Sequence, residues 1–197
     1  MKKVWIVVLV VALLLGSMMI GKYNKFVTMD EGVNLAWSQV ETQYQRRADL
    51  IPQIVTVAQQ YASEERETFQ SVIEARSAAT SVTVNADNLE GLQTFAAKQG
   101  ELTQALSKLM LLREAYPDLK SAPLFAELQV QLEGTENRIA TERGRFNETA
   151  AAFNTLIRQF PNNLFGWFFG FGVKPLFEWT VGSDVAPNVW DIFDSRE

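Results

Sequence analysis

The chain has 197 residues, 47% of them hydrophobic, and its 18 basic and 23 acidic side chains give a net charge of −5. It contains neither histidine nor cysteine, which excludes Ser-His-Asp and Cys-His catalysis, His/Cys zinc sites, iron–sulfur clusters and disulfides. The many aromatic residues argue against a disordered chain, and without a basic excess we expect no nucleic-acid partner.

Residues 1–22 are predicted to form a transmembrane anchor with a short basic N-terminus. An uncharged stretch from Val4 to Gly21 follows Lys2 and Lys3. As a helix this stretch would be about 27 Å long, close to the hydrocarbon thickness of about 30 Å. A cleaved signal peptide is the alternative, but the apolar run is longer than a usual signal core and lacks a good cleavage site. The N-terminal lysines favour a cytoplasmic N-terminus, with the body outside the cytoplasm.

A long helix is predicted next, over about residues 29–80. Its apolar residues recur at spacings of three and four, which is typical of a helix packed in a bundle. Pro52 lacks a backbone donor, so we expect a kink or a split there. Residues 80–88 are predicted to form a loop in which Asn85 or Asp87 caps the following helix.

Two further helices are predicted, over about residues 87–116 and 123–160. Pro117 ends the first of them and Pro161 the second. Three long helices, of which the first is broken at a proline, indicate an all-α fold. We expect an antiparallel three- or four-helix bundle with long helices over residues 23–161, and a coiled coil is the alternative.

Polar residues interrupt the apolar stripes of these helices. Arg47 on the first helix, and Thr135 and Glu142 on the third, fall where an apolar side chain is expected. Because a buried charge is costly unless paired, we predict an interhelical polar network in which Arg47 pairs with Glu142 or Glu136. Thr135 and Asn137 would support this pair. The network either sets the register of the helices or lines a ligand pocket.

Other polar groupings do not predict a catalytic or metal site. Glu133 and Glu136 lie one turn apart, but the usual di-metal site of a helical bundle also needs histidine. Ser107 and Lys108 are adjacent, and therefore point about 100° apart on a helix, which is poor geometry for a nucleophile and its base. We therefore expect no catalytic residue, metal or cofactor.

Gly134 costs about 1 kcal/mol relative to alanine in mid-helix, so we expect another helix to approach closely there.

Residues 162–197 are predicted to be a C-terminal tail of different composition. Aromatic residues are concentrated from Phe160 onward, and glycines and prolines prevent a long helix. Five aromatic residues within seven positions are predicted to contact a membrane interface or a partner protein: Phe165, Trp167, Phe168, Phe169 and Phe171. The alternative is a tail that folds over the body and fills its open end.

Several segments together resemble the bacterial LemA family. They are Tyr23-Asn24, Asp30-Glu31, Ala36–Glu41, Gln45–Pro52, Glu114–Lys120, Leu132–Ile139, Arg143, Phe146-Asn147, Phe153-Asn154 and Phe160-Pro161. The resemblance covers about residues 1–161 and implies an N-terminal membrane helix, an extracytoplasmic body and an antiparallel helical bundle, with no established catalytic residues. The aromatic density after Phe160 is richer than expected for the family.

We therefore expect a non-enzymatic, membrane-anchored helical scaffold or interaction protein of the bacterial cell envelope. It would assemble with itself or with an envelope protein, because its stripes and its aromatic tail provide surfaces rather than chemistry. The alternative is an extracytoplasmic ligand-binding or sensing bundle that uses the network of Arg47, Glu136 and Glu142. A hydrolase that relies on carboxylates alone ranks last.

Overall fold

The computed structural model describes residues 2–177, which form helices and no strand. The prediction of an all-α fold is therefore confirmed for this part of the chain. The helices are α1 (Lys2–Tyr61), α2 (Arg66–Ser81), α3 (Leu89–Ala115), α4 (Pro117–Lys120), α5 (Pro123–Arg158) and α6 (Asn162–Phe169).

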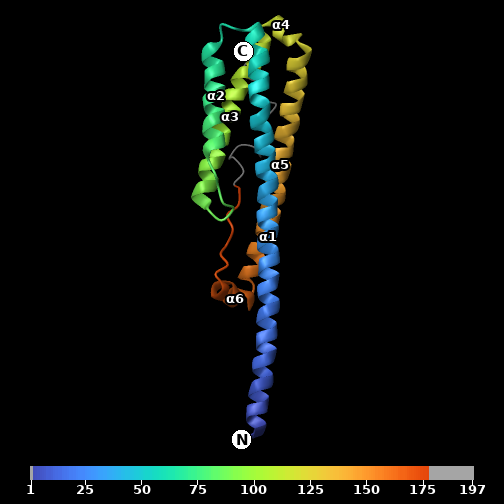
Figure 1. The fold of residues 1–197 in the computed structure, drawn as a ribbon, viewed down its shortest axis with the longest axis vertical. Coiled ribbons are helices and arrows are strands. Elements are labelled where there is room, and N and C mark those ends of the chain that lie inside the picture. Colours follow the sequence, from blue (N-terminus) through green and yellow to red (C-terminus); the bar gives the residue numbers. More distant parts are fainter. Residues whose placement is uncertain (1, 178–197) are drawn as a thin grey trace, which may run out of the picture.

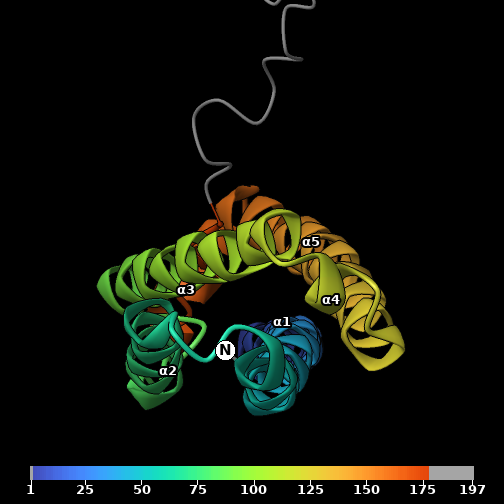
Figure 2. The same cartoon turned by 90° about the horizontal axis from the view of Figure 1, so that it is seen from above.

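The long helices lie alongside one another in an elongated body (Figure 1). α1 lies along α5, and α2 lies along α3. In Figure 1, α1 rises from the N-terminus, α2 descends, α3 rises and α5 descends again, and the short α4 connects α3 to α5 at the upper end. Figure 2 shows the same four long helices end-on.

α1 is one continuous helix of 60 residues that passes through Pro52. The predicted split of the helix at this proline is therefore wrong. Pro52 leaves the carbonyl of Ala48 without its intrahelical donor, but Arg76 of α2 replaces that donor, because its Nε donates to the Ala48 carbonyl oxygen at 2.7 Å. The first long helix ends instead at Tyr61, and the chain turns into α2 over residues 62–65.

The ends of the other helices differ from the prediction by a few residues. Asn88 caps α3, where its side chain accepts a 3.0 Å hydrogen bond from the backbone amide three residues on. The predicted cap at Asn85 or Asp87 is therefore wrong. α5 ends at Arg158, earlier than predicted, and Phe160 beyond its end is 81% exposed.

The apolar interior divides into two clusters along the long axis of the body. The upper cluster, in the orientation of Figure 1, includes Ile51, Ile54, Val72, Leu109 and Phe125. The lower cluster includes Phe26, Trp37, Phe95, Phe146, Phe153 and Phe177.

Gly134 lies outside both clusters. A Cβ added there would meet nothing within 4 Å, so the predicted close approach of another helix is wrong.

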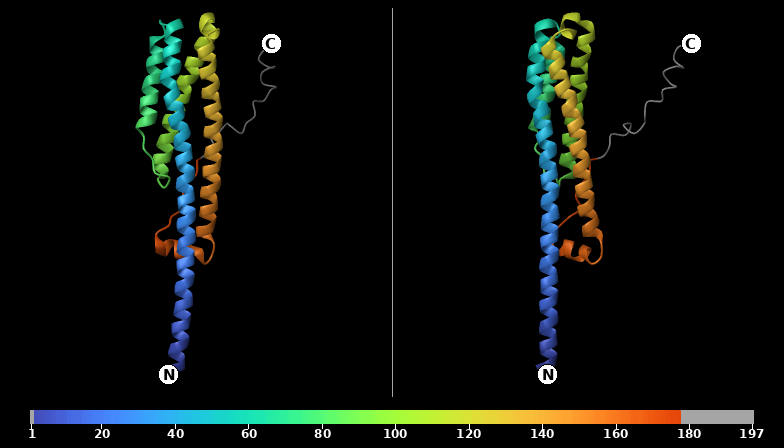
Figure 3. Two further views of the ribbon diagram at one scale, coloured as in Figure 1. Left: turned by 45° about the vertical axis from the view of Figure 1, so that its right-hand side comes forward. Right: turned by 90° about the vertical axis from the view of Figure 1, so that its right-hand side faces the viewer.

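Among residues 2–177, α1 alone continues below the lower end of the body (Figure 3). Within residues 2–177 it is the one helix long and apolar enough to span a membrane, judged by length and composition. Trp5, Leu13 and Ile20 in this stretch are 72%, 66% and 64% exposed. An apolar surface that no other helix covers is what a membrane-spanning segment requires.

Candidate functional site

A layer of polar side chains separates the two hydrophobic clusters. On α1, α3 and α5 alike, the lower cluster gives way to the upper one across a turn with a buried polar residue, at Arg47, Gln99 and Thr135 respectively. Arg47 is 1% exposed and is among the largest fully buried side chains of the described residues. We call this level the polar layer.

Arg47 connects three helices directly. Its Nη1 donates to Oε1 of Glu136 on α5 at 2.7 Å and to Oγ1 of Thr103 on α3 at 3.1 Å. Its Nη2 donates to the side-chain oxygen of Gln99 on α3. Gln99 in turn donates to the carbonyl oxygen of Ala79 on α2 at 3.3 Å. The layer therefore links all four long helices through hydrogen bonds.

The structure brings one of the predicted partners to Arg47 and places the others elsewhere. Glu136 forms the ion pair. Glu142 pairs within its own helix instead, because it lies about 9 Å further along α5 at 1.5 Å per residue. Thr135 is 2% exposed, but its hydroxyl donates to a carbonyl oxygen of α5 itself, and Asn137 is exposed. Of the two partners predicted for Arg47, Glu136 is therefore the correct one and Glu142 is not.

Two members of the layer were missed by the sequence analysis. Gln99 and Thr103 lie on α3, where an amide and a hydroxyl supply the remaining acceptors for Arg47. Gln99 could have been found, because it occupies an inner position between Phe95 and Leu102 in the stripe of that helix. Thr103 as a whole residue is exposed, so the apolar pattern of α3 did not indicate a role for it.

The polar layer offers little room for a ligand. A cavity of about 110 Å³ between α1, α2 and α3 reaches Gln99, whereas pockets for small molecules usually measure about 300–1,000 Å³. Burial raises the pKa of the Tyr44 hydroxyl at the edge of this cavity, and the positive charges of Arg143 and Arg47 oppose that shift. Within residues 2–177 no group of three or more acidic side chains could hold a metal ion.

A second candidate site lies against α1 and α5 at the lower end of the body, and we call it the collar. It consists of α6 and the following segment, residues 170–177, which return along α1 and α5 (Figure 1). The ring of Phe169 lies 5.1 Å from that of Tyr23, and the ring of Phe171 lies 5.5 Å from that of Phe26. Tyr23 follows the end of the apolar stretch by two residues, so α6 meets α1 about 3 Å beyond that end.

The five aromatic residues predicted to make contacts divide between two faces of the collar. Phe165, Phe169 and Phe171 pack against the lower cluster. Trp167 and Phe168 point outward and are 84% and 64% exposed. The alternative in which the tail fills the open end of the body therefore describes Phe165, Phe169 and Phe171. The contact with a membrane interface or partner stays a prediction for the exposed Trp167 and Phe168. Residues 178–197 of the predicted tail lie outside the described residues.

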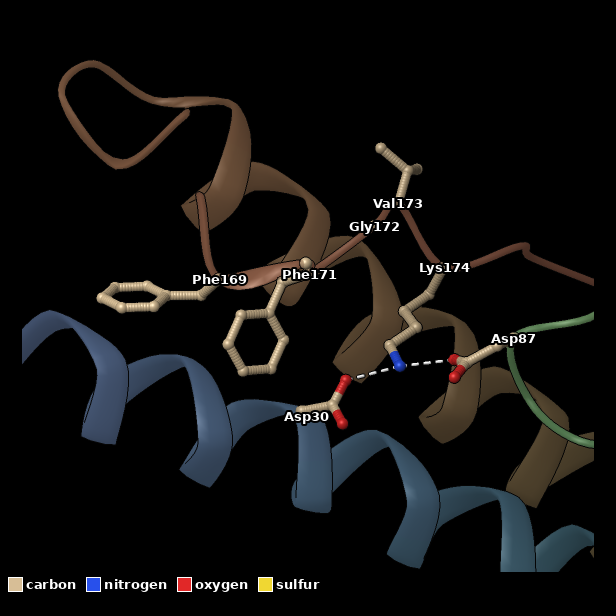
Figure 4. A pocket seen from close by; sticks show the side chains of 8 residues that line it. Asp30, Asp87, Phe169, Phe171, Gly172, Val173 and Lys174 are labelled. Atoms are coloured by element: carbon tan, nitrogen blue, oxygen red, sulfur yellow. Dashed lines mark hydrogen bonds and ion pairs between the residues drawn. The ribbon is translucent and has the colours of Figure 1, made fainter. Parts of the chain in front are cut away.

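Lys174 anchors the collar to two other elements (Figure 4). It is 6% exposed and lies between Asp30 of α1, at 2.5 Å, and Asp87 of the loop between α2 and α3. Burial lowers the pKa of Lys174, but its bonds to the two carboxylates more than offset this effect, so that the pKa lies above its ordinary value of 10.5. The three residues line a cavity of about 380 Å³ beside the collar. The lysine charge is already matched there by two carboxylates, so the cavity does not favour an anion.

Two asparagines of α5 bind the backbone of the collar. The Asn154 amide donates to the carbonyl oxygen of Lys174 at 2.8 Å, and its oxygen accepts from the Lys174 amide at 2.7 Å. Asn147 makes the same pair of bonds with Phe177, at 2.9 and 2.8 Å. Sequence analysis assigned these asparagines no role, although each follows a buried phenylalanine and the two lie seven residues apart.

Comparisons with known proteins cover most of the chain. A sequence model described as LemA family matches residues 36–190. Magnetosome protein MamQ 2 of Paramagnetospirillum magneticum is 25% identical over 169 residues, and magnetosome protein MamQ of Magnetospirillum gryphiswaldense is 27% identical over 170 residues. Each alignment covers 76% of this chain and 62% of the relative. The chain thus spans less than two thirds of the length of these curated relatives.

Proposed function

The chain belongs to the LemA family, and from this premise we propose that it is a non-enzymatic, membrane-anchored scaffold of the bacterial cell envelope. In this proposal its long helices form an antiparallel bundle that assembles with further copies. The resemblance to the family is confirmed, and the match to residue 190 extends beyond residue 161, where the sequence resemblance ended. The collar therefore falls within the matched region.

The observation that carries the proposal is that the exposed side of α6 lies close to the end of the predicted membrane span. Leu164, Trp167 and Phe168 share one side of α6 and are 58%, 84% and 64% exposed. α6 lies across the direction of α1 (Figure 3) and meets it about 3 Å beyond the apolar stretch. The polar interface on each side of a bilayer is roughly 5–8 Å thick. The outward face of α6 would therefore lie at the level of the headgroups, where Trp is favoured and where amphipathic helices lie in the membrane plane.

A membrane contact at this point would hold the body upright. From Gly21 to Tyr61, α1 rises about 60 Å at 1.5 Å per residue, and α5 lies alongside it. The polar layer adds hydrogen bonds between the helices partway up this rod. A long rigid surface at a fixed orientation supports a scaffold role. We further propose that the N-terminus is cytoplasmic, because Lys2 and Lys3 precede the span.

The ligand-binding alternative is not favoured. It required Arg47, Glu136 and Glu142 to line one pocket, but Glu142 pairs within α5. The cavity that reaches the layer measures about 110 Å³, which is below the usual size of a small-molecule site.

The membrane contact can be tested with spin labels, because the chain has no cysteine. Phe168→Cys places a label on the outward face of α6, and Asn137→Cys places one on an exposed polar position of α5, away from the collar. In liposomes containing the full chain, we expect the label at position 168 to be accessible to oxygen and protected from a water-soluble relaxation agent. We expect the reverse at position 137. Equal accessibility to the water-soluble agent at both positions would show that α6 does not rest on the membrane.

Self-assembly is tested separately by chemical cross-linking of the full chain in liposomes. We expect cross-linked dimers and larger species. A chain that yields monomers only, at protein densities where a known membrane dimer is captured, would overturn the self-assembly part of the proposal.

A further inference from the structure

The segment from Phe171 to Phe177 occupies a groove built like a peptide-binding site. We define the groove by the two asparagines Asn147 and Asn154 of α5, together with the side chains that contact residues 174 and 177. The two asparagines are two helical turns apart, which corresponds to about 10.5 Å. Three residues of extended chain span about 10 Å, so successive asparagines meet every third residue of an extended peptide that runs antiparallel to α5.

The two asparagines bind the backbone of the segment rather than its side chains. A side-chain amide offers one acceptor and a donor group, and each asparagine uses both on the N–H and C=O of a single residue. These bonds would form with almost any residue in the extended conformation. They are the main-chain component of peptide recognition, to which side-chain pockets add specificity.

Two pockets supply that specificity. Phe177 is 5% exposed and stacks on Trp37 with ring centroids 5.6 Å apart. Phe146 meets its ring edge-on at 5.6 Å, and the Arg143 guanidinium lies 4.5 Å above it. The other pocket is acidic and consists of the two aspartates around Lys174. The groove thus fits an extended segment with a lysine three residues before a phenylalanine.

We propose that this groove binds the 174–177 segment of a second copy of the chain, so that neighbouring copies in the membrane exchange their C-terminal segments. The proposal rests on the self-assembly proposed above and names the contact that produces it. An exchanged segment would make every contact seen within one chain, so exchange costs little beyond the change at its hinge.

Two glycines between α6 and Lys174 provide a hinge for the exchange. Gly170 ends α6 with a φ of +79°, a conformation that other residues rarely adopt, and Gly172 follows after one residue. A Cβ added at either glycine would meet nothing within 4 Å. Because glycine adopts a wide range of backbone conformations, the segment beyond these two positions can turn toward a neighbour.

Membrane anchoring favours the exchange. Copies held by the same N-terminal helix share one orientation, so each groove lies at the same height as its neighbour's segment, and confinement raises the effective concentration. Residues 170–173 can span at most about 14 Å. Exchange therefore requires copies in direct contact at the collar, and copies this close can be captured by cross-linking.

The test combines two complementary variants of the full chain. Asn147→Ala with Asn154→Ala removes the groove but keeps the segment, and Phe177→Ala weakens the segment but keeps the groove. Each variant carries a different tag, and both are reconstituted in liposomes, alone and together. We expect each variant alone to show at least a tenfold loss of cross-linked dimer, and the mixture to recover dimers that contain both tags. In that dimer the intact segment of the first variant occupies the intact groove of the second.

Matched controls separate exchange from misfolding. Asn137→Ala removes an exposed asparagine from the same helix, and Phe160→Ala removes an exposed phenylalanine near the collar. Both should cross-link like the wild type, and all variants should keep the wild-type helical circular dichroism signal. A variant that loses this signal is replaced by Asn154→Ala alone or by Phe177→Leu, with the same expectation for the mixture.

Two results would overturn the exchange. If each variant alone dimerises like the wild type, or if the mixture forms no more mixed dimer than the variants alone, the segment binds only within its own chain and the scaffold proposal is unaffected. A wild-type chain that remains monomeric would instead overturn the proposed self-assembly, and the exchange with it.

Discussion

The ion pair between Arg47 and Glu136 allows a quantitative test of the polar layer. Removing one partner of a fully buried ion pair costs about 3–5 kcal/mol. The Glu136 side chain, however, is 39% exposed, so solvent already screens part of the attraction. Arg47 also keeps acceptors on Gln99 and Thr103, and a glutamine at position 136 can still accept its hydrogen bond. We therefore expect Glu136→Gln to lower the free energy of unfolding by about 1–2 kcal/mol.

A double-mutant cycle isolates this interaction. Arg47→Met keeps the long side chain and removes the buried charge. With the arginine gone, Glu136 has no interhelical charge to meet and its carboxylate is partly solvated, so Glu136→Gln should then change the free energy of unfolding by less than about 0.5 kcal/mol. The expected coupling is about 1 kcal/mol, above the scatter of independent sites. The assay is urea unfolding of the full chain in detergent, followed by circular dichroism. Equal costs of Glu136→Gln in both backgrounds would refute the reasoning.

Three further predictions concern other parts of the body. Gly134→Ala should raise the free energy of unfolding by about 0.5–1 kcal/mol, seen as a higher urea midpoint, because an added Cβ meets nothing within 4 Å; a lower midpoint would contradict this. Arg76→Met should cost about 1–2 kcal/mol in the presence of Pro52, but much less beside Pro52→Ala, where the Ala48 carbonyl regains its intrahelical donor; equal costs in urea unfolding would contradict the account of α1. Because the pKa of Lys174 is raised above 10.5, its contribution to stability is complete below that pH and is lost as the pH rises through the higher folded-state pKa. Protease cleavage of the collar should therefore increase at alkaline pH in the wild type more than in Lys174→Met, and identical pH profiles would count against this role.

The helices could be predicted from the sequence because their signal is local. An apolar residue every three or four positions specifies both the helix and its inward face. In α3 the apolar residues that follow this spacing are buried: Leu92, Phe95, Leu102, Leu106 and Leu109. The continuity of α1 through Pro52 could not be predicted this way. It depends on Arg76, which is 28 residues away in the chain and reaches the exposed carbonyl only after α2 has folded back.

The site residues show the same division between local and non-local information. Periodicity identified Arg47, Thr135 and Glu142 as polar residues on inner faces, because it reports which face a residue occupies. It does not report the height of one helix against another, so it could not decide between Glu136 and Glu142 as the partner of Arg47. In the tail, Trp167 follows Phe165 by two residues, so the two side chains point to nearly opposite sides of a helix and their spacing already implies two faces. Which face turns inward is decided by Tyr23 and the lower cluster of α1, which lie far away in the sequence.

The polar layer and the groove are coupled through the register of α1 and α5. Glu136, Asn147 and Asn154 all lie on α5, whereas Arg47 and the Trp37 side of the groove lie on α1. A slip of α5 by one turn, about 5.4 Å, would separate the ion pair, and it would also move both asparagines relative to the pocket that holds the phenylalanine. The same ion pair that stabilises the middle of the rod therefore keeps the groove aligned at its lower end. A variant that weakens the layer should loosen the collar even though the two sites share no residue.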